Sequence, residues 1–385
     1  MFAAILLCAL SLERLAQIDN FDFFSVYDIE SKKGTCDILD HVRLTGADTM
    51  MWRVNSGTSP RFADRDQSLA YLTPPVNRLR IPDPHGQYTG WQRLFAPAFG
   101  TYQFAMEECA RRKLGKCAYW PYEENHWAYF TLGEWNLDHP QYWCQFRDGR
   151  PWHGRCSVAW PEVRECKLRF LDQILAGGCD TLYIEAFRTG NWDTSKAYVK
   201  PHVDAWRAQY PGEDLPKPDD PRWRNIVWQS NLAFFRGVRA RLDASGRKVR
   251  FLFGIYEISK TSDPTWTKKA IDWRAMVREG IVDGIVLASV AFDERRPLES
   301  TRELYEYVKK DVAPKQFFVP VSAYDYQHCS VDRYARLLGV SKGEATAKLM
   351  NLAGEVGATG VILECVDYQN YTPEMATAIR DFGKQ

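Results

Sequence analysis

The stretch GGCDTLYIEAFRTGNW (177–192) has the pattern of a buried β-strand that ends on a carboxylate. Leu182 and Ile184 alternate with Tyr183 and Glu185. Successive side chains of a strand point to opposite faces, so we expect the aliphatic pair to face helices and Tyr183 and Glu185 to face inward. An inward carboxylate costs desolvation energy unless it is paired or used. The stretch therefore predicts a strand and a candidate functional acid.

Similar apolar runs recur along the chain, with amphipathic segments between them. The predicted strands are FFSVYD (23–28), TMMWRV (49–54), CAYWPY (117–122), TLYIEAF (181–187), VRFLFGIYE (249–257), GIVLASV (284–290), FFVPVSA (317–323) and GVILECV (360–366). The predicted helices, several of which stop on glycine, include 36–46, 102–115, 161–178, 225–246 and 300–312. Eight strands separated by helices predict a parallel sheet closed as one (β/α)8 barrel. An open doubly wound sheet is the alternative, but the chain lacks its dinucleotide-binding glycine pattern.

The connections that follow the predicted strands are longer than those that precede them. Long loops come after the second, third and fourth strands, at 56–100, 123–160 and 210–223, whereas helix-to-strand connections such as TGAD are brief. This asymmetry predicts that the C-terminal face of the barrel carries the function. We expect a catalytic barrel at 21–385 and an N-terminal segment at 1–20, either a degenerate signal peptide or a helix capping the barrel base.

Composition narrows the class of partner. Hydrophobic residues make up 45%, enough for a full core, and the net charge of +1 argues against nucleic acid as a partner. The apolar N-terminal run is too short to span a membrane. Among ten cysteines none is spaced as CxxC, which favours a cytoplasmic location over a periplasmic or secreted one. Cys144 and Cys156 would pair only in an oxidising compartment. Composition leaves the oligomeric state open.

Strand ends supply the catalytic candidates, because side chains at the C-terminal ends of barrel strands surround the pocket. We select Glu185, Glu364 and Glu257. Glu364 repeats the Glu185 pattern, since Ile362 and Glu364 face inward by the same alternation. The direction of Glu257 is ambiguous because both faces of its strand are apolar. For each acid, an ion pair at the barrel rim is the structural alternative.

The same strand ends and the loops after them supply substrate-binding candidates. These are Asp28, Arg53, Trp120, Glu124, His126, Trp127, Arg188, Trp192, Asp293 and Tyr324. Arginine and histidine would hydrogen-bond sugar hydroxyls or a substrate carboxylate, and tryptophan would offer a flat stacking face. Aspartate at a turn and tryptophan in a core are the structural alternatives.

Paired carboxylates beside aromatic rings indicate glycoside chemistry. One carboxylic acid protonates the leaving oxygen, and a second acts as nucleophile or as base for water. The chain has 14 Trp and 19 Tyr, an excess that suits a carbohydrate substrate. It lacks an HxH motif after the first predicted strand and HExxH, GxxxxGK[ST] and GxSxG motifs elsewhere. We therefore predict no metal and no cofactor.

Three long stretches of the chain resemble bacterial family-10-type glycosyl-hydrolase-like proteins: 23–55, 135–188 and 201–249. The resemblance covers most of 20–290 and is strongest at 135–250. It implies a (β/α)8 barrel and glycoside hydrolase activity. In that group the fourth strand more often ends in aspartate, whereas this chain has YIEAFR and places Glu185, one methylene longer, at the same point.

These patterns together predict a glycoside hydrolase that acts in bacterial glycan degradation, with Glu185 as its first catalytic carboxylate. Two alternatives stay open. One is a carbohydrate-binding barrel without turnover, and the other is a sugar epimerase or lyase, which would convert its substrate without consuming water.

Overall fold

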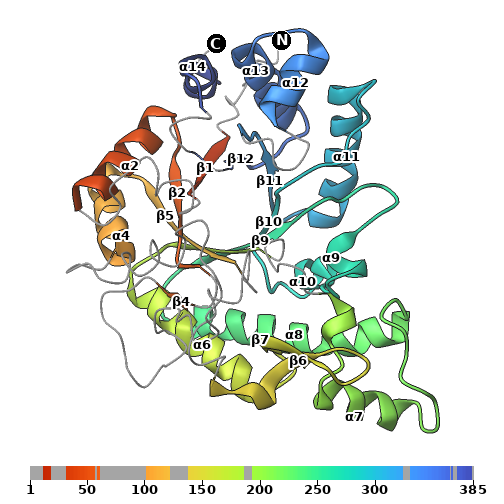
Figure 1. Ribbon diagram of the computed structural model, residues 1–385. Helices are drawn as coiled ribbons and strands as arrows, with labels where there is room; N and C mark the ends of the chain where they lie inside the picture. The colour runs from red at the N-terminus through yellow and green to blue at the C-terminus, as the bar shows by residue number, and fades with distance from the viewer. Residues whose placement is uncertain are drawn as a thin grey trace, which may run out of the picture.

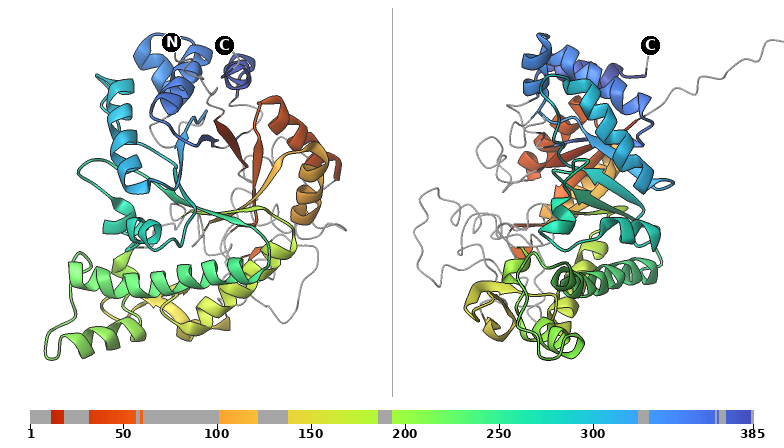
Figure 2. Two further views of the ribbon diagram at one scale, coloured as in Figure 1. Left: turned by 180° about the vertical axis from the view of Figure 1, so that it is seen from behind. Right: turned by 90° about the vertical axis from the view of Figure 1, so that its right-hand side faces the viewer.

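Eight parallel strands close into a barrel with helices around it (Figures 1 and 2). The computed structural model describes residues 12–18, 32–56, 59–60, 101–121, 138–185, 193–323, 330–364, 366 and 371–383. Around the barrel the strands are β1 (Glu13–Ile18), β2 (Thr49–Arg53), β5 (Gly115–Pro121), β8 (Thr181–Glu185), β9 (Arg250–Ile255), β10 (Gly284–Leu287), β11 (Gln316–Pro320) and β12 (Gly360–Leu363). The predicted (β/α)8 barrel is thereby confirmed.

The first strand differs from its prediction. Seven barrel strands lie within or beside their predicted ranges, but the place expected for 23–28 is taken by β1, which pairs with β2 on one side and β12 on the other. Residues 23–28 lie outside the described residues. The barrel thus includes residues of the segment 1–20, which the sequence pattern had set apart. The hydrophobic pattern did not predict β1, because its inner face carries two polar residues, Glu13 and Gln17, on either side of Leu15.

Helices follow the strands and begin and end on recognisable signals. The longer ones are α2 (Lys32–Leu44), α4 (Thr101–Arg112), α6 (Pro161–Ala176), α8 (Pro221–Ala244), α11 (Pro297–Val312) and α13 (Lys342–Glu355). The shorter ones are α7 (Lys200–Gln209), α9 (Pro264–Thr267), α10 (Trp273–Arg278), α12 (Val331–Leu338) and α14 (Pro373–Asp381). Ser341 and Glu344 form a capping box at the start of α13, and α12 ends at Gly339 with φ 66°. The five helices predicted at 36–46, 102–115, 161–178, 225–246 and 300–312 correspond to α2, α4, α6, α8 and α11.

Two apolar layers follow from the alternation along the strands. The outer layer, between strands and helices, includes Leu182, Ile184, Val361 and Leu363. The inner layer fills the barrel with Leu15, Met51, Cys117, Tyr119, Tyr183, Leu252, Val286, Phe318 and Ile362. The inward direction predicted for the odd residues of β8 and the even residues of β12 is therefore confirmed for Tyr183 and Ile362.

The connections after β5 and β8 carry structure of their own. After β5 come the turn η3 (Pro140–Tyr142) and the hairpin of β6 (Trp143–Gln145) and β7 (Pro151–Cys156); after β8 come η4 (Thr194–Lys196) and α7. Figure 1 shows the hairpin and α7 beside α6 and α8, at the lower edge of the molecule. Cys144 and Cys156 form no disulfide; Cys144 packs in the apolar cluster of this unit and Cys156 in the main core. Within the described ranges, no helix is long and apolar enough to cross a membrane.

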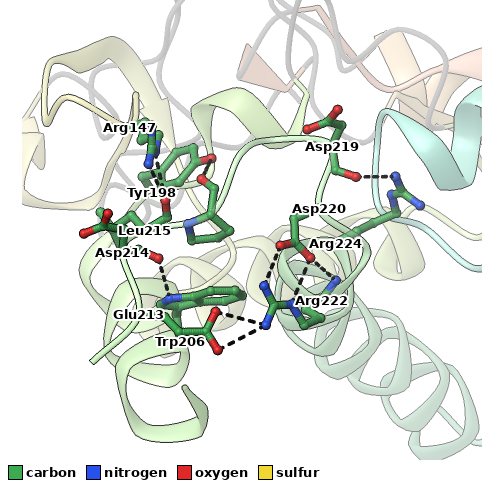
Figure 3. Close-up of polar contacts among 11 residues, drawn as sticks. Arg147, Tyr198, Trp206, Glu213, Asp214, Leu215, Asp219, Asp220, Arg222 and Arg224 are labelled. Carbon is green, nitrogen blue, oxygen red and sulfur yellow. Dashed lines mark hydrogen bonds and ion pairs between the residues drawn. The ribbon is translucent and has the colours of Figure 1, made fainter. Parts of the chain in front are cut away.

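Cation–aromatic stacking holds α7 and the loop after it against α8. The Arg222 guanidinium lies 4.8 Å from the ring centroid of Trp206 and 4.7 Å from that of Tyr210. The same guanidinium pairs with Asp220 at 3.0 Å and Glu213 at 3.1 Å (Figure 3). The proline- and aspartate-rich stretch between α7 and α8 is thereby an ordered part of the fold.

Closure of the barrel at β12 gives a first prediction. A Cβ added at Gly360 would overlap the Glu13 carbonyl oxygen and lie 2.8 Å from the Phe318 ring. We expect Gly360→Ala to lower the free energy of unfolding by about 1–3 kcal/mol, the usual cost of overpacking, as measured by urea denaturation. The control is Gly237→Ala in α8, whose Cβ would meet only the flexible Leu168 side chain at 3.0 Å. Equal stability of the two variants would contradict the pairing of β1 with β12.

A buried histidine gives a second prediction. His202 in α7 is 3% exposed; its Nδ1 lies 2.8 Å from the Ala197 carbonyl oxygen and its Nε2 2.9 Å from Ser230 Oγ. Burial lowers the pKa of His202 to about 4, and the charge of Arg164 adds to this effect. The unfolded chain therefore binds the proton first, so stability present above about pH 6.5 is lost as the pH falls towards 4.

We expect His202→Gln to remove that part of the pH dependence. The wild-type slope between pH 6.5 and 4 should exceed the variant's by up to one proton, about 1.4 kcal/mol per pH unit, in denaturation curves collected across the range. Parallel curves for the two proteins would show that folding does not lower the pKa of His202.

Candidate functional site at the C-terminal mouth of the barrel

Buried polar side chains lie above the inner apolar layer, at the C-terminal ends of the strands. Arg53 and Glu185 are the last residues of β2 and β8, and Glu364 directly follows β12. Gln17 is two residues beyond Leu15 on β1 and so shares its inward direction. Arg53, Glu185 and Gln17 are 0% exposed and Glu364 is 4% exposed. Strand geometry therefore gathers four polar groups at one end of the barrel.

Two tyrosines hold the Glu185 carboxylate. The Tyr119 hydroxyl donates to Oε1 at 2.8 Å, and the Tyr183 hydroxyl donates to Oε2 at 3.2 Å. Tyr119 and Tyr183 are neighbours in the register of β5 and β8, with ring centroids 5.4 Å apart. Each carboxylate oxygen thus receives a phenol donor. Hydrogen bonds to an ionised acceptor are stronger than neutral ones and fix its orientation.

The electrostatics of Tyr183 connect the two predicted acids. Burial raises the pKa of Tyr183 well above 10, and the negative charges of Glu185 and Glu364 raise it further. The phenol therefore keeps its proton across the physiological range and stays a donor. Because the charge of Glu364 acts on the tyrosine that bonds Glu185, both carboxylates belong to one local electrostatic environment.

A glycine on the neighbouring strand leaves room for Tyr183. Gly254 on β9 is the register partner of Glu185, and a Cβ there would overlap the Tyr183 hydroxyl. The segment after β12 is also fixed: the Tyr371 hydroxyl donates to the Glu364 carbonyl at 3.3 Å and to the Val321 carbonyl at 3.2 Å. The surroundings of both carboxylates are thus set by backbone packing.

Glu257 lies apart from these buried groups. It comes two residues after β9, is exposed, and has φ 49°, which is uncommon outside glycine. Its backbone N–H donates to Ser289 Oγ at 3.0 Å. Strained residues of this kind tend to cluster at functional sites. The structure thus places Glu257 at the same end of the barrel, on its solvent side.

Two of the predicted substrate contacts have other roles in the structure. Trp120 is 0% exposed and packs edge-on against Phe170 and Phe234, with ring centroids 5.3 and 6.0 Å away. The prediction of a stacking face at Trp120 is wrong, because the alternation that turns Tyr119 inward turns Trp120 towards α6 and α8. Asp293 is exposed, and its Oδ1 accepts from the Arg295 backbone N–H at 3.0 Å in the turn before α11.

The remaining candidates lie outside the described residues: Asp28, Glu124, His126, Trp127, Arg188, Trp192 and Tyr324. Among the residues that the structure does describe, no group of three or more His, Cys, Asp or Glu could hold a metal ion. Sequence reasoning missed Gln17, Tyr119 and Tyr183 as site residues. The inward register of Tyr183 was visible in its strand, but the pairing with Tyr119 across β5 and β8 was not.

Comparison with known proteins supports the fold. No family model and no curated protein matches the chain. Among solved structures, it is similar to a beta-galactosidase from the psychrophilic Marinomonas ef1, with a TM-score of 0.57 and 10% identity over 97% of this chain and 59% of that one. An alpha-galactosidase from Lactobacillus brevis gives a TM-score of 0.51 and 11% identity over 97% of this chain and 40% of that one.

An alpha-glucosyl transfer enzyme gives a TM-score of 0.51 and 14% identity over 92% of this chain and 67% of that one. At such low identity these likenesses show the fold alone. The chain spans about 59% and 40% of the lengths of the two galactosidase structures. The class that fold and comparison define is a (β/α)8 barrel similar to those of glycoside-processing enzymes; the narrower resemblance to family-10-type proteins stays a prediction.

The tyrosine pair gives a third prediction. Tyr183→Phe removes the donor to Glu185 Oε2, and we expect it to lower the free energy of unfolding by about 1.5–3 kcal/mol, the range for a hydrogen bond to a charged group. Urea denaturation measures the change, with Tyr307→Phe on the half-buried side of α11 as the control. If both variants keep wild-type stability, the phenol does not bond the carboxylate.

Proposed function

We propose that this protein is a glycoside hydrolase whose reaction centre is the C-terminal mouth of the barrel, with Glu185 and Glu364 as the catalytic pair. The observation that carries the proposal is the buried Glu185 carboxylate, held by Tyr119 and Tyr183 at the strand ends, with the buried Glu364 directly after β12 at the same end of the barrel. Two carboxylates at one site are the requirement of most glycosidases.

The surroundings of the two acids suggest different roles. Two phenol donors fix both oxygens of Glu185. A carboxylate oriented in this way suits the nucleophile, or the base that activates water. Glu364 is 4% exposed, compared with 0% for Glu185. Contact with solvent suits the acid that protonates the leaving oxygen, because this acid must later regain a proton.

The remaining groups at the mouth would bind the substrate. Arg53 from β2 and Glu257 after β9 would hydrogen-bond sugar hydroxyls, one from within the barrel and one from its solvent side. The solved structures of similar fold are described as galactosidases and an alpha-glucosyl transfer enzyme, so galactosides and glucosides are the first substrates to try. We retain bacterial glycan degradation as the proposed setting.

One observation favours the alternative of a carbohydrate-binding barrel without turnover. Glu185 is 0% exposed, so its carboxylate has no contact with solvent in this structure, and a substrate would reach it only after a rearrangement. A barrel in which Glu185 serves only to order two tyrosines would bind a sugar at the rim and leave it intact. The experiment below separates these two functions.

The fourth prediction is the test of this function. We expect wild-type protein to release nitrophenol from a panel of p-nitrophenyl galactosides and glucosides, and Glu185→Gln or Glu364→Gln to reduce kcat by about 10²–10⁴-fold, the usual contribution of a positioned acid or base. Glu306→Gln, at an exposed glutamate of α11, is the matched control and should keep wild-type kcat.

Other outcomes of this experiment reject the proposal in distinguishable ways. Sugar binding without turnover, unchanged by Glu185→Gln, would support the binding barrel. Turnover that survives both substitutions would place the catalytic acids elsewhere. If Glu185→Gln alone is inactive, Glu257→Gln tests the third acid. The anomeric configuration of the first product, followed by NMR, then separates a retaining mechanism, with carboxyls about 5–5.5 Å apart, from an inverting one at roughly 6.5–9.5 Å.

A further inference from the structure

Gln17 is a buried polar residue that neither the fold nor the catalytic proposal uses. It lies on β1, two residues beyond Leu15, whose side chain belongs to the inner layer, so the Gln17 side chain also points into the barrel. The residue is 0% exposed. Neither its Oε1 nor its Nε2 has a hydrogen-bond partner in the part of the chain that the structure describes.

Such an amide is unfavourable for stability. A primary amide has two N–H donors and an oxygen with two lone pairs, and burial removes the water that would bond them. An unsatisfied buried polar atom carries its full desolvation penalty, whereas an apolar side chain of similar length would fill the same space without it. Buried polar groups in native proteins nearly always have partners. An amide in this position therefore indicates a partner that the described part of the chain does not provide.

The position of Gln17 indicates where that partner would lie. In the register, Gln17 pairs with Met51 on β2, and Ala16 pairs with Leu363 on β12. The next residue along β12 is Glu364, and the Val366 backbone N–H donates to the Gln17 carbonyl oxygen at 3.0 Å. Neighbouring strands lie about 4.8 Å apart, so the backbone positions of Gln17 and Glu364 are one strand spacing apart. A single sugar residue is large enough to contact side chains from both positions.

We propose that the Gln17 amide is a specificity-determining group that binds hydroxyls of the sugar held beside Glu364; this inference rests on the proposed function of the mouth. The chemistry of the amide selects such a ligand. Two neighbouring sugar hydroxyls donate and accept together, and so satisfy both Nε2 and Oε1. A carboxylate ligand would satisfy only the N–H groups, and a hydrocarbon would satisfy neither.

The experiment compares stability and sugar binding in Gln17→Met, which removes both polar atoms and nearly preserves volume. Binding is measured by calorimetry in a Glu185→Gln background, so that turnover does not interfere. The probes are the methyl α- and β-glycosides of galactose and glucose. Gln229→Met, at an exposed glutamine of α8, is the matched control.

We expect the Gln17→Met variant to unfold at the same temperature as its parent or at a higher one, and to bind the tightest probe about tenfold more weakly or worse. The control should change neither quantity. A lower unfolding temperature with unchanged sugar affinity would overturn the inference, because the amide would then bond a buried structural water only.

Monodeoxy analogues of the tightest probe keep the test decisive if Gln17→Met both destabilises the protein and weakens binding. One analogue, lacking the hydroxyl that Gln17 binds, should bind the parent about tenfold more weakly, yet bind Gln17→Met no more weakly than the full sugar does. If every deoxy analogue loses as much affinity for Gln17→Met as it loses for the parent, the inference would be overturned.

The outcomes for Gln17 and for the proposed function are distinguishable. Sugar binding that depends on Gln17 in a protein without turnover would reject the hydrolase and leave this inference standing. Turnover and affinity unchanged in Gln17→Met would reject the inference and leave the hydrolase standing. If no probe binds the parent protein, both are rejected.

Discussion

Closure of the barrel between β1 and β12 is the constraint on which the site depends. Once the eight strands are joined in one ring, every second side chain must point into a narrow interior, whatever its chemistry. Glu185 ends β8 and Glu364 directly follows β12, and the ring brings these two positions, far apart in sequence, to the same end of the barrel. The same geometry sends Trp120 outward, where it packs against helices and has no access to a ligand.

The interior of this barrel is apolar in its middle and polar at both ends, for different reasons. At the N-terminal end Glu13 pairs with Arg250 at 2.6 Å and accepts from Thr49 Oγ1 at 3.0 Å. These groups satisfy one another and join β1, β2 and β9. At the C-terminal end the Glu185 carboxylate is held by tyrosines, while the Gln17 amide has no partner in the described part of the chain. The ion pair of Glu13 with Arg250 therefore has a structural role, whereas the Gln17 amide, unpaired among the described residues, is the basis for the proposed ligand contact.

The connections after β5 and β8 show how a long loop becomes part of the fold. Contact of the Arg222 guanidinium with the Trp206 and Tyr210 rings and its pairing with two carboxylates fix the chain around α7 (Figure 3). A buried aromatic cluster that includes Tyr198, Trp206 and Trp223 lies beneath it. Part of the aromatic excess that suggested a sugar substrate therefore serves to pack these connections, and this weakens composition as a guide to function.

The sequence by itself determined the barrel, because the strand-and-helix rhythm and the alternation within TLYIEAF and GVILECV reflect local backbone geometry. It also identified the inward directions of Tyr183 and Ile362, and with them Glu185 and Glu364 as the leading acids. Tertiary structure alone decided that Glu13–Ile18 is the first strand, since its polar inner residues are tolerated only where the barrel ends supply a partner or a ligand. It alone brought Tyr119 to Glu185, because hydrogen bonds between strands depend on register, and register is set by closure of the whole ring.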